Sequence, residues 1–371
     1  MSASTFRSPG RILFGAGVLE ALGRETHRFG DRAVLVTGRQ AVADAGVTGR
    51  ALASLGAAGL RVAVFNRVEP EPDVSTVDHC RQAVRAQRAV VVIGLGGGSA
   101  MDVAKATACL DGEDKPTAAF HQGEAITQSA LPIIAVPTTS GTGSEMTHNA
   151  VLSDRHRHSK ASIRAESMLP AVAIVDPEIT LSCPPAVTAA SGVDAFVQAV
   201  ESYLSRHATP MTEALSLRAV KELGRALPAV VTHGDDLALR TAAAWGSAMA
   251  GLALANARLG VVHGLAHPLG VRYHIPHGIV CGALLPAALE FNREAVPEKF
   301  AVLERVLGGD LVGYAQGLLL ACGLPPRLNE FGLAADAFEA IADEALPSGS
   351  TEANPRTVTR EDLLAMLATV A

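Results

Sequence analysis

The chain has 371 residues, 49% of them hydrophobic and 18% charged, with 31 Lys and Arg against 37 Asp and Glu. This composition is that of a globular protein long enough for two domains, and it excludes a disordered chain. The net charge of -6, without a long basic run, argues against nucleic acid as a partner, and no apolar run looks long enough to span a membrane.

The first half of the chain alternates apolar strands with helices. Strands are expected at 33–37, 61–65, 89–93, 133–136 and 171–175, and helices at 47–58 and 74–86. Strands that alternate with helices in this way predict a parallel sheet covered on both faces. A hairpin is also expected over residues 149–163, with a polar turn at 154–158.

After Pro184-Pro185, alanine and leucine dominate and β-branched runs become rare, which predicts helices to the end of the chain. Because proline disrupts a helix, we expect breaks near Pro210, Pro228, Pro268, Pro276, Pro286 and Pro325-Pro326. The fold class is therefore α/β, with a Rossmann-like parallel-sheet domain followed by an all-helical domain. The predicted domains are residues 1–180, which bind a nucleotide, and residues 181–371, which bind metal and substrate.

A glycine run follows the third predicted strand. Gly96-Gly97-Gly98-Ser99 precedes a helix that Ser99 is expected to cap, with Asp102 in its first turn. Glycine lets a backbone approach a phosphate, and a helix start supplies free N–H donors. The run predicts nucleotide binding. It is not the dinucleotide fingerprint after the first strand, where Thr37-Gly38-Arg39 stands instead.

A second polar loop runs from Pro137 to Glu145 after the strand at 133–136 and is rich in hydroxyls. Loops at the carboxyl ends of parallel strands are where such folds bind ligands. Taken alone, this loop is an ordinary polar connection.

The helical half holds a group of imidazoles. His263 and His267 are four residues apart and share one helix face, as do Asp194 and Gln198, and His277 follows in a loop. Aspartate and histidines suit a divalent metal, although this spacing alone is weak evidence.

Together, GGGSAMDVAK (96–105), PTTSGTGSE (137–145) and HGLAH (263–267) followed by His277-Gly278 resemble the iron-containing alcohol dehydrogenase family. The resemblance covers nearly the whole chain. It implies a nicotinamide-binding α/β domain, an all-helical domain, an active site in the cleft between them, and a homodimer. The implied reaction is hydride transfer between NAD or NADP and a primary alcohol, aldehyde or small carbonyl.

The resemblance also implies site residues. The cofactor contacts would be Gly38, Gly97, Gly98, Ser99, Asp102, Thr138, Thr139, Ser144, Asn149 and Lys160. The ligands of a divalent iron or zinc ion would be Asp194, Gln198, His263 and His277, and His267 would orient substrate or relay a proton.

Three positions depart from the family pattern. Gln198 stands where many members have histidine, and an amide oxygen is a weaker ligand than imidazole. Gly38-Arg39 replaces the aspartate that repels the extra phosphate of NADP, so either cofactor fits. Glu71 stands where asparagine is common, and its carboxylate is expected to counteract Arg39.

We therefore expect an oxidoreductase that interconverts a primary alcohol and an aldehyde. The alternatives are a maleylacetate-reductase-like enzyme, a dehydroquinate-synthase-like lyase and a non-catalytic nucleotide-binding protein. Five scattered cysteines without a CxxC pair, and an N-terminus without an apolar signal segment, point to a cytoplasmic protein.

Overall fold

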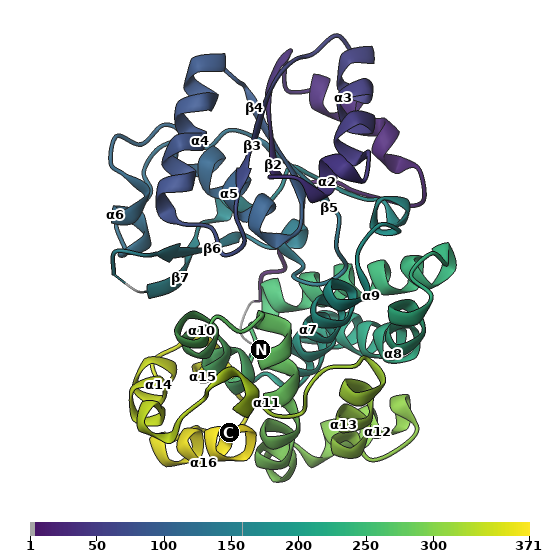
Figure 1. The fold of residues 1–371 in the computed structure, drawn as a ribbon, viewed down its shortest axis with the longest axis vertical. Coiled ribbons are helices and arrows are strands. Elements are labelled where there is room, and N and C mark those ends of the chain that lie inside the picture. Colours follow the sequence, from purple (N-terminus) through teal and green to yellow (C-terminus); the bar gives the residue numbers. More distant parts are fainter. Residues whose placement is uncertain (1–3, 158) are drawn as a thin grey trace. The chain divides into compact units, whose positions relative to one another are not determined.

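The computed structural model describes residues 4–157 and 159–371, which form two compact units (Figure 1). The sheet unit comprises Ser8–Thr139 and Ser144–Ser182. The helical unit comprises Ser140–Gly143, Cys183–Ala371 and the described part of Met1–Arg7. Residue 158 of the expected hairpin turn and the first three residues of the N-terminal segment lie outside the described residues.

The sheet unit is built on six parallel strands in the order β1-β8-β5-β4-β2-β3. The strands are β1 Ile12–Phe14, β2 Arg32–Gly38, β3 Arg61–Val68, β4 Val91–Gly96, β5 Ile133–Pro137 and β8 Val172–Val175. A separate antiparallel hairpin pairs β6 Asn149–Asp154 with β7 Ser159–Arg164. Both the parallel sheet and the hairpin were expected from the sequence, whereas the short edge strand β1 was not.

Helices cover both faces of this sheet (Figure 1). They are α1 Leu22–His27, α2 Ala41–Asp44, α3 Val47–Ala57, α4 Val74–Gln87, α5 Gly98–Leu110 and α6 Thr117–His121. Successive side chains of a strand point to opposite faces. Val34 and Val36 accordingly pack in one buried cluster with α4 and α5, while Ala33 and Leu35 pack in another with α1 and α3. Because both faces are buried, the strands are apolar throughout, as expected.

The carboxyl ends of β2 and β4 lie side by side, with Thr37 opposite Leu95. The chain passes from β2 to β3 on one side and then returns to β4 on the other side of β2. Open α/β sheets bind ligands at such a reversal of strand order. Gly38 and the glycine run after β4 therefore meet at the edge where a ligand is expected.

The helical unit contains no strand within residues 183–371. Its helices are α7 Pro185–Leu204, α8 Pro210–Thr232, α9 Leu237–Ala257, α10 Val261–Tyr273, α11 His277–Asn292, α12 Pro297–Leu307, α13 Leu311–Ala321, α14 Phe338–Ala345, α15 Gly349–Ala353 and α16 Arg360–Val370. The largely buried α7 packs against α8, α9 and α11. The expected all-helical second half is confirmed.

Helix α9 meets the length and composition of a membrane span, contrary to the expectation that no apolar run does. Half of its apolar window is buried, and it packs against α7 and α8. The feature thus fits a core helix of the helical unit.

Three of the expected proline breaks are wrong. Pro228, Pro268 and Pro286 lie inside α8, α10 and α11, whereas Pro210 and Pro276 stand at helix starts as expected. An interior proline leaves the carbonyl four residues earlier without its helical partner. In α8 that carbonyl belongs to Gly224, and it accepts a hydrogen bond of 2.8 Å from the Tyr314 hydroxyl.

Candidate functional site

The glycine run forms a cradle, defined here as Gly96–Ser99 at the start of α5. Gly96 has a φ of +154°, and a side chain there would meet the Cβ of Ala100 at 2.8 Å. Gly97 is the N-cap of α5, and no side chain caps this end. Ser99 is therefore a helical residue and not the cap, and Asp102 lies beyond the first turn. The result is a half-buried helix start whose first backbone donors have no side-chain cap, which fits a pyrophosphate.

The threonines of the second loop lie against this cradle. The Thr138 N–H donates to the Gly96 carbonyl over 2.9 Å. A Cβ at Gly97 would begin 3.6 Å from the Thr139 hydroxyl oxygen. The structure thus brings together the backbone cradle and the hydroxyls that the sequence predicted for the cofactor.

Asp102 is enclosed by donors of its own chain. It accepts from the Ser144 hydroxyl at 2.5 Å and the Val151 N–H at 3.0 Å, and lies 3.2 Å from the ammonium of Lys105. That ammonium, fully buried, also donates to the Ser144 carbonyl at 2.9 Å and to Thr147 at 3.1 Å. Asp102 therefore ties α5 to β6, and any contribution of Asp102 to cofactor binding acts through this network.

Two further predicted contacts lie on the hairpin. The Lys160 ammonium donates to the Glu71 carboxylate over 2.7 Å, and the Asn149 amide donates to Ser162 over 3.4 Å. Glu71 therefore forms its ion pair with Lys160. The sequence had suggested that its carboxylate would counteract the charge of Arg39. The φ of Glu71, 52°, is one that asparagine adopts more readily than glutamate.

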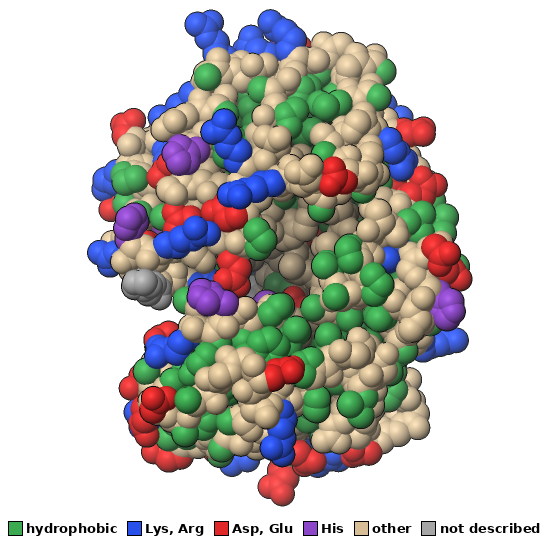
Figure 2. All heavy atoms as spheres, in the orientation of Figure 1, with side chains coloured by type: hydrophobic (Ala, Val, Ile, Leu, Met, Phe, Trp, Pro, Cys, Tyr) green, Lys and Arg blue, Asp and Glu red, His purple; other side chains and the backbone are tan. Residues whose placement is uncertain are grey.

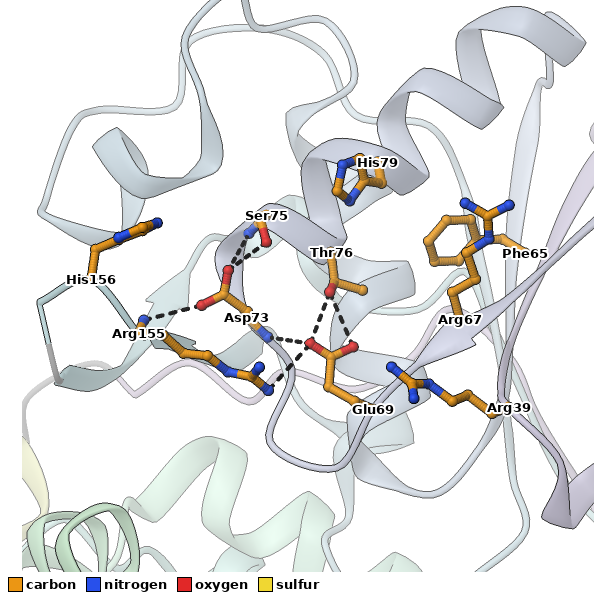
Figure 3. Close-up of a pocket in the computed structure, with 10 residues that line it drawn as sticks. All are labelled: Arg39, Phe65, Arg67, Glu69, Asp73, Ser75, Thr76, His79, Arg155 and His156. Carbon is orange, nitrogen blue, oxygen red and sulfur yellow. Dashed lines mark hydrogen bonds and ion pairs between the residues drawn. The ribbon is translucent and has the colours of Figure 1, made fainter.

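A pocket of about 600 Å³ lies in the sheet unit at the ends of β2 and β3 (Figure 3). It is lined by Arg39, Phe65, Arg67, Glu69, Asp73, Ser75, Thr76, His79, Arg155 and His156. Both acids are engaged: Glu69 accepts from Thr76 at 2.9 Å, and Asp73 accepts from Ser75 at 2.9 Å. Within residues 4–157 and 159–371, the exposed Arg39 and Arg67 form no side-chain hydrogen bond or ion pair. Figure 2 shows cationic, acidic and imidazole side chains mixed over this part of the sheet unit.

A second site lies wholly within the helical unit. The four-residue cluster comprises Asp194 of α7, His263 of α10, and His277 and Cys281 of α11, whose ligand atoms all lie within 4.8 Å of one another. His263 Nε2 is 3.2 Å and His277 Nε2 is 3.7 Å from Asp194 Oδ1. Cys281 Sγ is 3.5 Å from His277 Nε2 and 3.8 Å from His263 Nε2. One oxygen, two imidazole nitrogens and one sulfur facing a common point fit a transition-metal ion better than Mg²⁺ or Ca²⁺.

Burial and the facing groups set the charges of this cluster. Burial works to raise the pKa of Asp194, but the facing imidazoles of His277 and His263 hold it below its ordinary value. Burial likewise works to lower the pKa of His263, but Cys281, Asp194 and Glu201 raise it well above its ordinary value. Burial raises the pKa of the Cys281 thiol to about 12. Without a bound cation, these shifts favour an ionised Asp194 beside a protonated His263 and a neutral Cys281 thiol.

Glu201 supports the cluster from behind. Its carboxylate lies 2.6 Å from His263 Nδ1 and accepts the Val262 N–H at 2.8 Å. This contact orients the His263 ring so that Nε2 faces Asp194, an arrangement typical of metal-binding histidines. Neither Glu201 nor Cys281 was predicted from the sequence to have a role at this site. Their signals are helical spacing: Glu201 lies seven residues after Asp194, and Cys281 four after His277.

The remaining two predicted residues lie beside the cluster. The His267 ring stacks on that of His277, with centroids 5.4 Å apart and planes at 26°. The Gln198 amide nitrogen donates to Asp194 Oδ2 over 2.9 Å, and its buried oxygen has no hydrogen-bond partner among the described residues.

Comparison with known proteins identifies the same family over both units. Residues 9–177 match the model of the iron-containing alcohol dehydrogenases, and residues 188–371 match the C-terminal model of the Fe-containing alcohol dehydrogenase family. The sulfoacetaldehyde reductase of Bilophila wadsworthia is 34% identical over 96% of both chains. A crystal structure of 1,3-propanediol oxidoreductase superposes with a TM-score of 0.96 at 31% identity over the whole of both chains. The sulfoacetaldehyde reductase of Bifidobacterium kashiwanohense, in complex with NAD+, gives a TM-score of 0.92 at 31% identity, covering 100% of this chain and 99% of that one.

These relatives are reductases or oxidoreductases, so the lyase, maleylacetate-reductase-like and non-catalytic alternatives are not favoured. Sequence, fold and the buried oxygen, nitrogen and sulfur cluster agree, and the chain belongs to the iron-containing alcohol dehydrogenase family.

Proposed function

We propose that this protein is a metal-assisted, NAD(P)-dependent oxidoreductase that interconverts a primary alcohol and an aldehyde. The observation that carries the proposal is the buried cluster of Asp194, His263, His277 and Cys281 in a chain that also has an uncapped glycine cradle. The first feature suits a divalent cation, and the second suits a dinucleotide. Membership of the family supports the combination.

Each unit has a separate task in this proposal. When bound, the cation supplies a Lewis acid for a substrate oxygen, and the nicotinamide supplies or accepts a hydride. The N–H groups at Gly98 and Ser99 hold the pyrophosphate, and Thr138 and Thr139 contact the cofactor beyond it. Glu201 keeps the His263 ring oriented toward the ligand site.

We assign the proton transfer to His267, because its ring stacks on His277 without belonging to the four-residue cluster. Alcohol oxidation releases one proton for each hydride moved, and a positioned base removes it. Replacing His267 with alanine should lower the rate of hydride transfer by about 100-fold or more, with little change in the Kd of NAD(P)H. Single-turnover kinetics and a fluorescence titration separate the two effects. Unchanged turnover by this variant would remove His267 from the mechanism.

The pocket in Figure 3 is proposed to hold the adenosine end of the cofactor. Its volume of about 600 Å³ suits part of a dinucleotide. Arg39 directly follows Gly38 at the end of β2, the strand beside β4 and the cradle. Two arginines without acidic partners among the described residues would favour the extra phosphate of NADP(H), while NAD(H) remains compatible with the site.

The test is cofactor oxidation with a panel of aldehydes, measured with NADH and NADPH separately. The panel includes sulfoacetaldehyde, which gives two relatives their names. We expect turnover that a chelator abolishes and that one divalent metal restores. Absence of turnover with both cofactors over the whole panel would overturn the proposal.

We also propose that residues 1–180 form the nucleotide-binding domain and residues 181–371 the metal and substrate domain. The compact sheet and helical units support this division. The proposed setting is the cytoplasm, which five free cysteines support, and the family supports a homodimer.

A further inference from the structure

Position 198 is occupied by a residue that already has another bond. The Gln198 amide nitrogen donates to Asp194 Oδ2 at 2.9 Å, and the lone pair of an amide nitrogen is delocalised into the carbonyl and does not bind a metal. Turning the amide over would place its oxygen against the carboxylate of Asp194, which is unfavourable. The amide oxygen instead lies beside Gly143, where a Cβ would begin 3.8 Å away. Gln198 therefore orients Asp194, and the set predicted from the sequence is left with three ligands: Asp194, His263 and His277.

Cys281 Sγ lies beside the other three ligand atoms. Four ligand atoms at ordinary bond lengths around a tetrahedral zinc ion are separated by about 3.3–3.6 Å, with the longer separations involving sulfur. Cys281 Sγ lies 3.5 and 3.8 Å from the Nε2 atoms of His277 and His263. Asp194 Oδ1 lies 3.2 and 3.7 Å from the same two nitrogens. These four of the six separations match those of a tetrahedral site within a few tenths of an ångström, and all four ligand atoms lie within 4.8 Å of one another.

The backbone around Cys281 also favours this arrangement. His277 and Cys281 are four residues apart on α11, so both project from one face of that helix. Gly278 and Gly282 lie between and beside them on the same helix. A Cβ at Gly278 would lie 1.9 Å from the Ala190 carbonyl oxygen, so glycine allows α11 to approach α7 and bring both ligands toward Asp194.

We propose that Cys281 is the fourth protein ligand of the metal, giving an Asp-His-His-Cys site that binds zinc in preference to iron. A thiolate is a soft ligand, and mixed nitrogen and sulfur sets bind Zn²⁺ more tightly than Fe²⁺. Metal binding replaces the S–H bond with a sulfur–metal bond and releases the thiol proton to solvent, together with the proton of a protonated His263, without a redox change. The inference rests on the proposed metal site and not on turnover, because coordination is measured directly.

The decisive experiment is X-ray absorption at the zinc edge of the full-length protein loaded with one equivalent of zinc. We expect one sulfur at ~2.3 Å and three nitrogen or oxygen ligands at ~2.0–2.1 Å. With cobalt in place of zinc, the same ligand set should give a thiolate-to-cobalt charge-transfer band. A zinc spectrum without sulfur would overturn the proposal.

Variants separate the two candidate ligands. C281S should remove the sulfur shell and the cobalt band and weaken zinc binding by about 100-fold or more. Replacing a residue that only hydrogen-bonds to a metal ligand already lowers metal affinity by about 10–100-fold. Q198A should keep the sulfur shell. C80A, at a buried cysteine of the sheet unit, is the matched control and should change neither signal. If C281S does not fold, the wild-type and Q198A spectra still decide the question.

Competition tests the metal preference. Metal-free protein dialysed against equal zinc and ferrous iron under anaerobic conditions should retain zinc in at least tenfold excess, measured by mass spectrometry. Retention of iron in excess would overturn the preference for zinc. A sulfur shell without turnover of any alcohol or aldehyde would contradict the proposed function and leave this inference standing, whereas metal-dependent turnover without a sulfur shell would do the reverse.

Discussion

At the scale of single residues, Gly38 is the position that we expect to influence the choice between NAD(H) and NADP(H). A Cβ there would meet only the Val68 carbonyl, at 3.9 Å, so a side chain fits. Replacing Gly38 with aspartate should lower kcat/KM for NADPH relative to NADH by about tenfold or more, since a carboxylate near a phosphate costs more than about 1 kcal/mol. The measurement is the ratio of the two kcat/KM values.

Two further substitutions check that assignment. Arg39→Ala and Arg67→Ala should shift the same ratio in the same direction, because each removes a cation from the pocket. Arg327→Ala, at an exposed site of the helical unit, is the control. An unchanged ratio in both pocket variants would place the adenosine elsewhere.

Glu145 gives the sheet unit a pH-dependent stability. Burial raises the pKa of this carboxyl to about 7, although Lys105 nearby opposes the rise. Between the ordinary value of 4.5 and 7, the folded state holds a proton that the unfolded state has lost, so the free energy of unfolding falls as the pH rises through this window. The loss is on the order of 3 kcal/mol. It is complete above the folded pKa.

The glutamine variant isolates this contribution. Urea unfolding of Glu145→Gln at pH 5 and pH 8 should show a smaller loss of stability than the wild type. Glu20→Gln, at an exposed glutamate of the sheet unit, should behave like the wild type. Parallel pH dependence in the wild type and Glu145→Gln would contradict the raised pKa.

Residue patterns predicted part of the site and missed part of it. The glycine run and the histidines stand out in combination, although the histidine spacing alone is weak evidence. Cys281 and Glu201 gain their roles only when α7, α10 and α11 pack together. A cysteine in an apolar helix and a glutamate in a long helix have no distinctive pattern of their own.

At the scale of elements, glycines decide how closely the metal-bearing helices approach. Gly278→Ala would place a Cβ 1.9 Å from the Ala190 carbonyl oxygen, so α11 must move away from α7. We expect a loss of about 1–3 kcal/mol in the free energy of unfolding, together with weaker zinc retention. Denaturant unfolding and metal analysis of the dialysed protein measure the two effects.

Gly317→Ala on α13 is the matched control, since nothing lies within 4 Å of its Cβ. It removes a helical glycine from an open position and should stabilise the protein by about 0.5–1 kcal/mol. A stability loss of equal size in both variants would mean that the contact with α7 does not explain the first result.

The helix breaks that were wrongly predicted at three prolines also concern whole elements. Pro228, Pro268 and Pro286 each follow a glycine by four residues, and in α8 the carbonyl freed by proline is satisfied by Tyr314. A hydroxyl from α13, about 90 residues away in the chain, cannot be inferred from local composition. Helix breaks at proline depend on such partners, which only the folded unit supplies.

At the scale of the whole molecule, the two ligands are expected to act on different units. Zinc at about 100 times its Kd should add about 2.7 kcal/mol of stability. In hydrogen exchange of the full-length protein, zinc should slow amides of α7, α10 and α11, whereas NAD(P)H should slow those of the β4–α5 connection. Zinc protection confined to the sheet unit would contradict the assignment of the metal to the helical unit.

The architecture was predictable because its signals are long. Five apolar strands alternating with helices, followed by a half rich in alanine and leucine, specify the fold class. The short strand β1 was missed because three residues are too few for a periodic pattern. That Ser140–Gly143 belongs to the helical unit was also not visible, since four residues of loop carry no information about what they pack against.

The rate at which Lys105 is acylated offers a measure of how often the network behind the cradle opens. Its ammonium is fully buried and held by Asp102, Thr147 and the Ser144 carbonyl. An acylating reagent reaches such an amine only while α5 and the segment Ser144–Met146 are apart. The labelling rate of this one lysine should therefore report how often these two segments separate, and a dinucleotide bound at the proposed cradle should lower that rate.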